Sequence, residues 1–263
     1  ERVVEGHITR IFADAAIGWI DRHKKDRWFL WLATTAPHPP YVHDPKHSYA
    51  RGEIEPPPLW PKGEALSDHD WAGYYSTISM LDEQVGRVLD SLDALGLSEN
   101  TFVFLAGDNG FMMGSHGHRA KQVWFEESAR TPALARWPGR IPAGALGPTP
   151  LSGVDLLPTL CEAAGVLPPP DCRGLSMLPA LTGKSPLRET VFAEVGSSSK
   201  DRWEMLRSQR HKYVLRGNGE ELLYDLEADP GELRNLSEEA SSAPVLGEMR
   251  RLREDWIKRT PTP

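Results

Sequence analysis

The feature that most constrains the fold is an alternation of helical patterns with short, continuously apolar runs. Apolar residues recur at helical spacing over residues 8–23 and again over 68–95. Each pattern is followed by a short apolar run, at 28–33 and at 101–105, that is typical of a strand buried on both faces. This order predicts an α/β domain with a largely parallel sheet flanked by helices.

The second part of the chain has a different pattern. A strand near 132–136 and a helix near 154–164 continue the first domain, but short strands joined by turns then predominate and a last helix is expected over 242–258. The short strands are expected at 190–195, 203–208, 212–216 and 221–224. We therefore predict two domains: residues 1–186 as the α/β part, and residues 187–263 as a small antiparallel α+β subdomain.

Charge and hydropathy exclude several functions. A formal net charge of −7 gives no support to binding of nucleic acid or anionic membranes. No apolar run reaches the roughly 18 to 20 residues of a membrane-spanning helix. The chain opens at Glu1 without a signal peptide or an initiator Met, so a periplasmic, a secreted and a cytoplasmic location all stay open. Cys161 and Cys172 are compatible with a disulfide or with two free thiols.

Polar residues follow both predicted strands of the first domain. His38 comes after the run at 28–33, and Asp108 and Asn109 come after the run at 101–105. Ligands bind beyond the carboxyl ends of strands in open α/β sheets. If the two strands are parallel, the three side chains lie on the same rim of the sheet.

The Asp108-Asn109 pair provides a carboxylate and an amide oxygen, which suit calcium or magnesium. Gly107 and Gly110 permit a sharp turn that presents both side chains. A plain Asx-type turn explains the same residues, and the local motif by itself favours that interpretation.

A glycine-containing loop with basic residues follows at 114–121. Lys121 could hold an anionic oxygen, and a histidine could protonate a leaving group. A solvated basic loop is the alternative. The His116–His118 spacing gives only weak support to zinc, because no third nitrogen or sulfur ligand is nearby.

Six ordered segments of the chain resemble the sulfatases of the alkaline-phosphatase-like superfamily, over about residues 8–236. The segments are APHPP, MLDEQVGRVLDSLDALGLSENTFVFLAGDNG, HGHRAKQVWFEESARTPALARWPGRIPAG, SGVDLLPTLCEAAGV, RGLSMLPALTG and ELLYDLEADPGELRNL. The resemblance implies that Asp108 and Asn109 are metal ligands, with Ca²⁺ expected and Mg²⁺ as the alternative.

The resemblance also assigns the polar residues around the sulfate group. It implies that Lys121 contacts the sulfate and the nucleophile, and that His38 contacts the sulfate oxygens on the leaving-group side. His116 is a weaker candidate for substrate binding, and neither His116 nor His118 receives a firm role. The expected substrate is a small sulfate ester, and the alcohol that it releases stays open.

The chain departs from the family pattern at the nucleophile. Sulfatases convert a cysteine or serine in C/S-x-P/A-x-R to formylglycine, whereas Cys161 is followed by Glu-Ala-Ala-Gly and Cys172 by Arg-Gly-Leu-Ser. The first aspartate pair of the family's metal site is also missing. Both features belong to the N-terminal half of such enzymes, so formylglycine is expected there and the chain resembles only the later part.

Three interpretations follow. The first is part of a sulfatase that provides metal-binding and sulfate-binding residues but no nucleophile, and that alone is inactive and self-associates or pairs with the N-terminal half. The second is part of a phosphate or phosphonate ester hydrolase of the same superfamily. The third is a non-catalytic binding protein on a degenerate sulfatase fold.

Overall fold

The computed structural model of the protein describes residues 5–50, 52–55, 68–147, 149–184, 186–196 and 202–259, without the side chains of residues 68–70. The chain divides into two compact units. Unit 1 contains Glu1–Phe102 and Met113–Arg119, and unit 2 contains Val103–Met112 and Ala120–Pro263. The predicted domain boundary between residues 186 and 187 stays a prediction.

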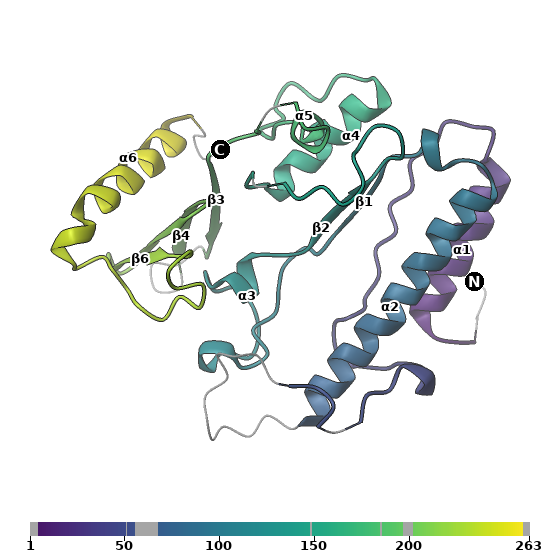
Figure 1. Ribbon diagram of the computed structural model, residues 1–263, viewed down its shortest axis with the longest axis horizontal. Coiled ribbons are helices and arrows are strands. Elements are labelled where there is room, and N and C mark those ends of the chain that lie inside the picture. Colours follow the sequence, from purple (N-terminus) through teal and green to yellow (C-terminus); the bar gives the residue numbers. More distant parts are fainter. Residues whose placement is uncertain are drawn as a thin grey trace. The chain divides into compact units, whose positions relative to one another are not determined.

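Unit 1 is built on two long helices that pack side by side (Figure 1). They are α1 (Ile8–His23) and α2 (Asp68–Ala94), and they confirm the helices predicted from apolar periodicity. An ion pair of 2.6 Å between Arg87 and Asp14 joins them at the surface. Their most deeply buried apolar side chains are Ala13, Ala16, Ile20, Met80 and Leu92.

The run at 28–33 does not form the predicted buried strand within the described residues. Phe29 is 64% exposed and Trp31 is 66% exposed, although both are large apolar side chains. A buried strand needs neighbouring strands for its backbone groups and covering layers on its two faces. The described part of the chain provides no strand partner for this run, so the composition of the segment alone was misleading.

The long proline-rich stretch at 41–66 is described only in part. It contains one short 3-10 turn, η1 (Pro45–His47), and its residues 56–66 lie outside the described ranges. A second such turn, η2 (Ser98–Asn100), connects α2 to the first strand of unit 2.

In unit 2 the first strand pair is antiparallel. β1 (Val103–Ala106) pairs with β2 (Ala133–Arg136), with Leu105 opposite Leu134. A largely parallel sheet is expected for this region, but the described residues contain no parallel pair. The predicted burial on both faces is also wrong, because Leu105 is 39% exposed and Leu134 is 61% exposed. Apolar composition carries no information on the direction of a strand, so the pairing was decided by the tertiary structure.

A buried carboxylate fixes the next element. Asp155 is fully buried at the end of a 3-10 turn, η4 (Gly153–Asp155), which leads into α4 (Leu156–Ala164). Its carboxylate accepts hydrogen bonds from the amides of Ser152 and Leu175, each at 2.9 Å, and pairs with Arg188. These contacts tie the start of α4 to two later parts of the chain. A short helix, α5 (Leu178–Leu181), follows.

The predicted antiparallel subdomain is present. Four strands pair in the order β3-β4-β5-β6, all antiparallel, and α6 (Ala243–Arg259) lies along one face of the sheet (Figure 1). The strands are β3 (Thr190–Val195), β4 (Trp203–Ser208), β5 (His211–Arg216) and β6 (Glu221–Asp225).

Apolar clusters cover both faces of this sheet. Under α6 the cluster contains Leu206, Tyr213, Leu223, Leu246 and Met249. The cluster on the opposite face contains Met112, Phe125, Trp203, Met205, Val214, Leu222 and Tyr224. Because neighbouring residues of a strand point to opposite faces, one strand contributes to both clusters.

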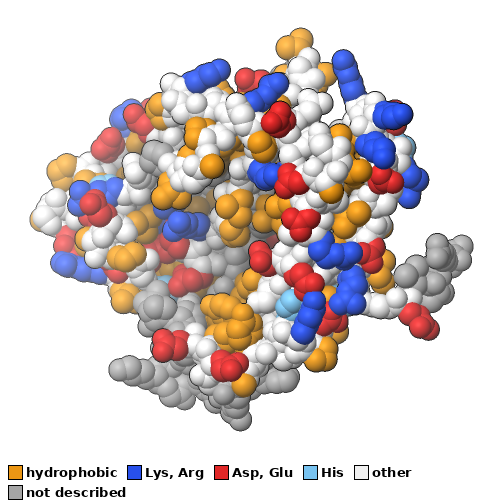
Figure 2. Space-filling view, turned by 45° about the vertical axis from the view of Figure 1, so that its right-hand side comes forward, with side chains coloured by type: hydrophobic (Ala, Val, Ile, Leu, Met, Phe, Trp, Pro, Cys, Tyr) orange, Lys and Arg blue, Asp and Glu red, His pale blue; other side chains and the backbone are white. Residues whose placement is uncertain are grey.

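The surface is mixed in character. On the face drawn in Figure 2, acidic and basic side chains are interspersed with exposed apolar ones. Within the described residues, no helix has both the length and the apolar character needed to cross a membrane. Cys161 and Cys172 are free thiols, which answers the question that the sequence left open.

Candidate functional site

The turn after β1 presents two oxygen atoms. The Asp108 carboxylate accepts the backbone amide of Asn109 through Oδ1 at 2.9 Å, and the Asn109 side-chain amide donates to the Gly110 carbonyl at 2.8 Å. Within the described residues, Asp108 Oδ2 and Asn109 Oδ1 form no hydrogen bond. The Asp108 carboxylate bonds to the amide of the next residue and not to the amide two residues on, so these contacts are not those of an Asx-type turn. The two oxygens that remain are of the hard type that calcium and magnesium prefer.

Gly110 has no room for a side chain. A Cβ placed on Gly110 would lie 2.0 Å from the Glu127 carbonyl oxygen, and the Gly110 amide donates to the Ser128 carbonyl at 2.8 Å. Both carbonyl groups belong to α3 (Glu126–Ala129). The turn with Asp108 and Asn109 is thus packed directly against this short helix.

The segment that carries Lys121 lies beside the same turn. The Met112 amide donates to the Ala120 carbonyl at 2.8 Å, which joins the segment that follows the turn to the residue before Lys121. The Lys121 side chain is half-buried, and its amine forms no hydrogen bond or ion pair with the described residues. Unit 2 therefore links the turn with Asp108 and Asn109 to the segment with Lys121 through one backbone hydrogen bond.

The other candidates belong to unit 1. His38 is exposed between two cis peptide bonds, Ala36-Pro37 and Pro39-Pro40, and its ring Nδ1 lies 2.9 Å from the Pro39 carbonyl oxygen. His116 is half-buried in the short turn η3 (Ser115–Gly117), where its backbone adopts a left-handed φ of 56°.

The described residues contain no complete metal site. No group of three or more His, Cys, Asp or Glu side chains converges among them. Asp108 and Asn109 fit a hard cation in chemical type, but Ca²⁺ takes roughly six to eight oxygen ligands. By themselves, the two residues would form only part of such a coordination shell.

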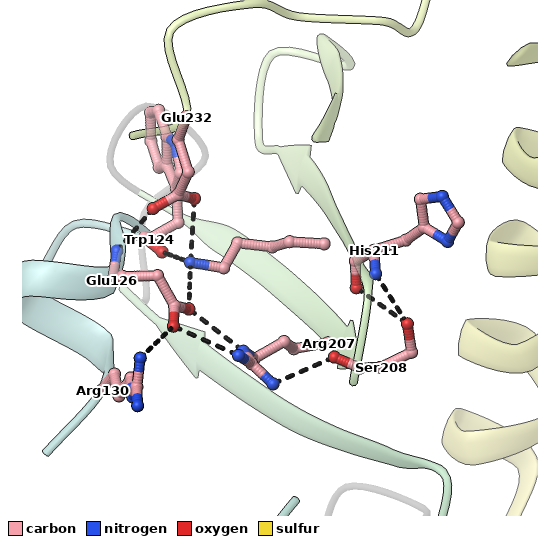
Figure 3. A network of polar contacts seen from close by, with 8 residues as sticks. Trp124, Glu126, Arg130, Arg207, Ser208, His211 and Glu232 are labelled. Carbon is pink, nitrogen blue, oxygen red and sulfur yellow. Dashed lines mark hydrogen bonds and ion pairs between the residues drawn. The ribbon is translucent and has the colours of Figure 1, made fainter. Parts of the chain in front are cut away.

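A buried charge cluster next to the Lys121 segment was not identified from the sequence. The Lys212 ammonium in β5 is fully buried, lies 2.7 Å from a carboxylate oxygen of Glu126 and 2.8 Å from one of Glu232, and donates to the Trp124 carbonyl at 2.9 Å. Figure 3 shows these contacts converging on one ammonium group. The sequence did contain one indication of this cluster. Lys212 stands two residues before Val214 in a predicted strand, so the two side chains point to the same face and Lys212 is expected to be buried with Val214.

The two carboxylates of this cluster respond differently to burial. Burial pushes the pKa of Glu126 upward, but the attraction and hydrogen bonds of Lys212 and Arg207 outweigh it and hold the pKa below its ordinary value. Burial raises the pKa of Glu232 above its ordinary value despite the pull of Lys212. The charge of the Glu126 carboxylate is therefore the better stabilised of the two.

Family models match most of the chain. A model described as Sulfatase matches residues 2–166, and one described as N-sulphoglucosamine sulphohydrolase, C-terminal, matches residues 114–258. The chain belongs to the sulfatase family.

A curated relative agrees with this assignment. The sulfatase chain is 31% identical over 222 residues to the N-acetylglucosamine-6-O-sulfatase of Bacteroides thetaiotaomicron, over 80% of this chain and 39% of the relative. It spans about two fifths of the length of the curated relatives that it matches.

Solved structures share the fold of this sulfatase chain. One, in complex with its substrate D-glucosamine-2-N,6-O-disulfate, has a TM-score of 0.82 at 22% identity, over 98% of this chain and 70% of that chain. The phosphonate monoester hydrolase of Silicibacter pomeroyi has a TM-score of 0.85 at 22% identity, over 96% of this chain and 60% of that chain. These likenesses confirm the predicted fold class.

Proposed function

We propose that this chain provides the metal-binding and sulfate-binding part of a sulfuric ester hydrolase. The observation that supports the proposal is the Met112–Ala120 hydrogen bond, which links the segment after the Asp108–Asn109 turn to the residue before Lys121. An anionic sulfate group is attracted both by a bound cation and by an unpaired ammonium group. A site that has both is suited to a substrate whose charge lies on oxygen atoms.

The proposed roles follow from this chemistry. Asp108 and Asn109 would hold the divalent cation, Ca²⁺ or alternatively Mg²⁺, which when bound polarises the sulfate oxygens. Lys121 would neutralise a sulfate oxygen as a point charge. His38 would contact the leaving-group side, where a histidine can donate a proton to the departing alcohol. His116 is proposed only as a contact of the substrate.

We propose that the nucleophile comes from polypeptide outside this sequence. Neither Cys161 nor Cys172 stands in the C/S-x-P/A-x-R context that formylglycine formation requires in the family. A formylglycine in a pairing N-terminal part would provide the attacking hydroxyl group. The chain by itself is then expected to bind substrate-like anions without hydrolysing sulfate esters.

A phosphate or phosphonate ester is the second candidate substrate class. The likeness in fold to a phosphonate monoester hydrolase favours it, because the same oxygen ligands and ammonium group suit a phosphonate monoanion. Turnover of an aryl sulfate against an aryl phosphonate by the chain combined with an N-terminal sulfatase part distinguishes the two.

The direct test of the binding role is calorimetric titration of the chain with inorganic sulfate in the presence of Ca²⁺, and with Ca²⁺ alone. Lys121→Met should weaken sulfate binding about tenfold, because one charge-assisted contact is lost. Asp108→Ala should weaken Ca²⁺ binding. Lys184→Met and Asp171→Asn change an exposed charge of the same type elsewhere in unit 2 and serve as matched controls.

Equal sulfate affinity in the chain and its Lys121→Met variant would contradict the role of Lys121. Equal Ca²⁺ affinity after Asp108→Ala would contradict the metal assignment. If the chain binds neither ion, the binding role itself is wrong, and a non-catalytic protein on a sulfatase fold becomes the better description.

A further inference from the structure

The short helix α3 connects the candidate site to the antiparallel sheet. On one side, the Ser128 carbonyl accepts the amide of Gly110, next to Asn109. On the other side, Glu126 pairs with Arg207 in β4 and with Lys212 in β5. The short helix α3 is thus bonded both to the sheet and to the turn with the proposed metal ligands, so the position of that turn depends on the sheet.

The segment between Lys121 and α3 is held by the same sheet. The Trp203 indole donates to the Gln122 carbonyl at 2.9 Å, and Gln122 adopts a left-handed φ of 72°. Lys212 donates to the Trp124 carbonyl two residues later. A left-handed backbone is disfavoured for a residue with a side chain, so the surrounding contacts must impose it.

Glu232 completes the cluster from a different part of the chain. One oxygen of its buried carboxylate pairs with Lys212, and the other accepts the Glu126 amide at 2.6 Å, at the start of α3. Glu232 is itself in a left-handed conformation, with a φ of 52°. The α3 terminus and the Lys212 ammonium are therefore fixed by one carboxylate.

Stability alone does not explain a fully buried lysine. Desolvation of an ion pair offsets much of its attraction, and apolar residues of similar volume often stabilise a core equally well. A buried charge does restrict its partners to a narrow set of positions, because any other arrangement leaves a charge unpaired. The partners of Lys212 are a backbone carbonyl and two carboxylates that all border the segment 121–126.

We propose that Lys212 is a positioning residue that fixes the segment 121–126 and with it the direction of the Lys121 amine. The inference rests on the proposed function, because the direction of the Lys121 amine matters only if that amine binds sulfate. Lys212 acts through Trp124, Glu126 and Glu232, and does not itself touch the substrate.

The test compares two neighbouring residues of β5 whose side chains point to opposite faces. Lys212→Met removes the ammonium group, and Tyr213→Phe, the matched control, removes the 2.5 Å hydrogen bond from Tyr213 to Glu221 on the other face. Lys212→Met combined with Glu232→Gln restores charge balance and guards against unfolding. Lys212→Arg is the conservative rescue. Hydrogen exchange at the amides of residues 122–126 and calorimetric sulfate binding are the two measurements.

In Lys212→Met, or in the charge-balanced variant, exchange at residues 122–126 should accelerate about tenfold or more, while the amides of α6 keep their protection. Sulfate binding should weaken in parallel, and Lys212→Arg should recover part of both. Tyr213→Phe should change neither. The proposal is overturned if exchange at 122–126 is unchanged, or if it accelerates equally in α6.

Failure of the proposed function is distinguishable from failure of this inference. If the unmodified chain binds no sulfate, the proposed function is wrong, but the exchange measurement still decides whether Lys212 fixes the segment. If sulfate binds and Lys212→Met leaves its affinity unchanged, the proposed function survives and the positioning role is wrong.

Discussion

The Gly110 amide donates a hydrogen bond of 2.8 Å to the Ser128 carbonyl, and this contact ties the turn with the proposed metal ligands to α3. Because Ser128 lies in the same short helix as Glu126, the turn is also connected to the charge cluster around Lys212. The conformation of the candidate site therefore depends on residues of the C-terminal sheet.

The close packing of Gly110 predicts a large effect of one methyl group. Gly110→Ala places Cβ against the Glu127 carbonyl and should lower the free energy of unfolding by about 1–3 kcal/mol, with weaker Ca²⁺ binding. Gly86→Ala is the control, because its Cβ meets nothing within 4 Å and lies inside α2, where alanine should stabilise by about 0.4–1 kcal/mol. Urea denaturation measures both, and equal effects of the two variants would contradict the packing argument.

Catalytic variants are expected to separate the roles of the site residues in an enzyme that combines this chain with a nucleophile-bearing part. Lys121→Ala should lower kcat by on the order of 10²–10³, as for the loss of one group that stabilises developing charge. Asp108→Ala should raise the Ca²⁺ concentration needed for half-maximal activity. Steady-state kinetics with an aryl sulfate across a Ca²⁺ series checks both. Near-normal kinetics in both variants would refute the site assignment.

The fully buried Asp155 predicts a strong dependence of stability on its partner. Arg188→Met leaves a buried carboxylate without its cation and should cost about 3–5 kcal/mol of unfolding free energy. Arg251→Met breaks an exposed pair with Asp255 in α6 and should cost at most about 1 kcal/mol. Denaturant melts of the two variants give the comparison, and a cost for Arg188→Met as small as that of the control would show that Asp155 does not need the pair.

Acid sensitivity is predicted for Asp225 in β6. Hydrogen bonds from Arg210 lower the pKa of Asp225 to about 2. A carboxyl group with a lowered folded-state pKa contributes stability above its unfolded pKa and loses it as the pH falls toward the folded value. This contribution should therefore disappear between about pH 4 and pH 2. The melting temperatures of the chain and of Asp225→Asn should differ at pH 7 and converge at pH 2; a constant difference would contradict the assignment.

Exposed apolar side chains predict self-association of the isolated chain. Phe29 and Trp31 are exposed by about two thirds and stand two residues apart, so another polypeptide can cover them. Phe29→Ser combined with Trp31→Ser should reduce the self-associated fraction in light scattering after size exclusion. Leu146→Ser changes a single leucine that is 96% exposed and should have little effect. A monomeric chain with a cooperative melt at high temperature would contradict this prediction.

Local patterns were sufficient for elements whose residues interact with near neighbours. The helices α1 and α2 and the four strands of the C-terminal sheet lie where periodicity and turns predict them. The run at 28–33 was predicted as a buried strand and is not one, because strand formation depends on a partner that its own residues do not specify. For the candidate site, the sequence order predicted Asp108, Asn109 and Lys121, and their roles stay predictions.

By itself the sequence determined the helices, the antiparallel subdomain and, through its ordered motifs, membership of the sulfatase family. The tertiary structure alone decided the antiparallel direction of β1 and β2 and the charge cluster around Lys212. The physical reason is distance along the chain. Lys212 and Trp124 are 88 residues apart in sequence, and their hydrogen bond exists only because the folded sheet brings them together. Short-range patterns record which side chains are apolar, but not which distant partner will neutralise a buried charge.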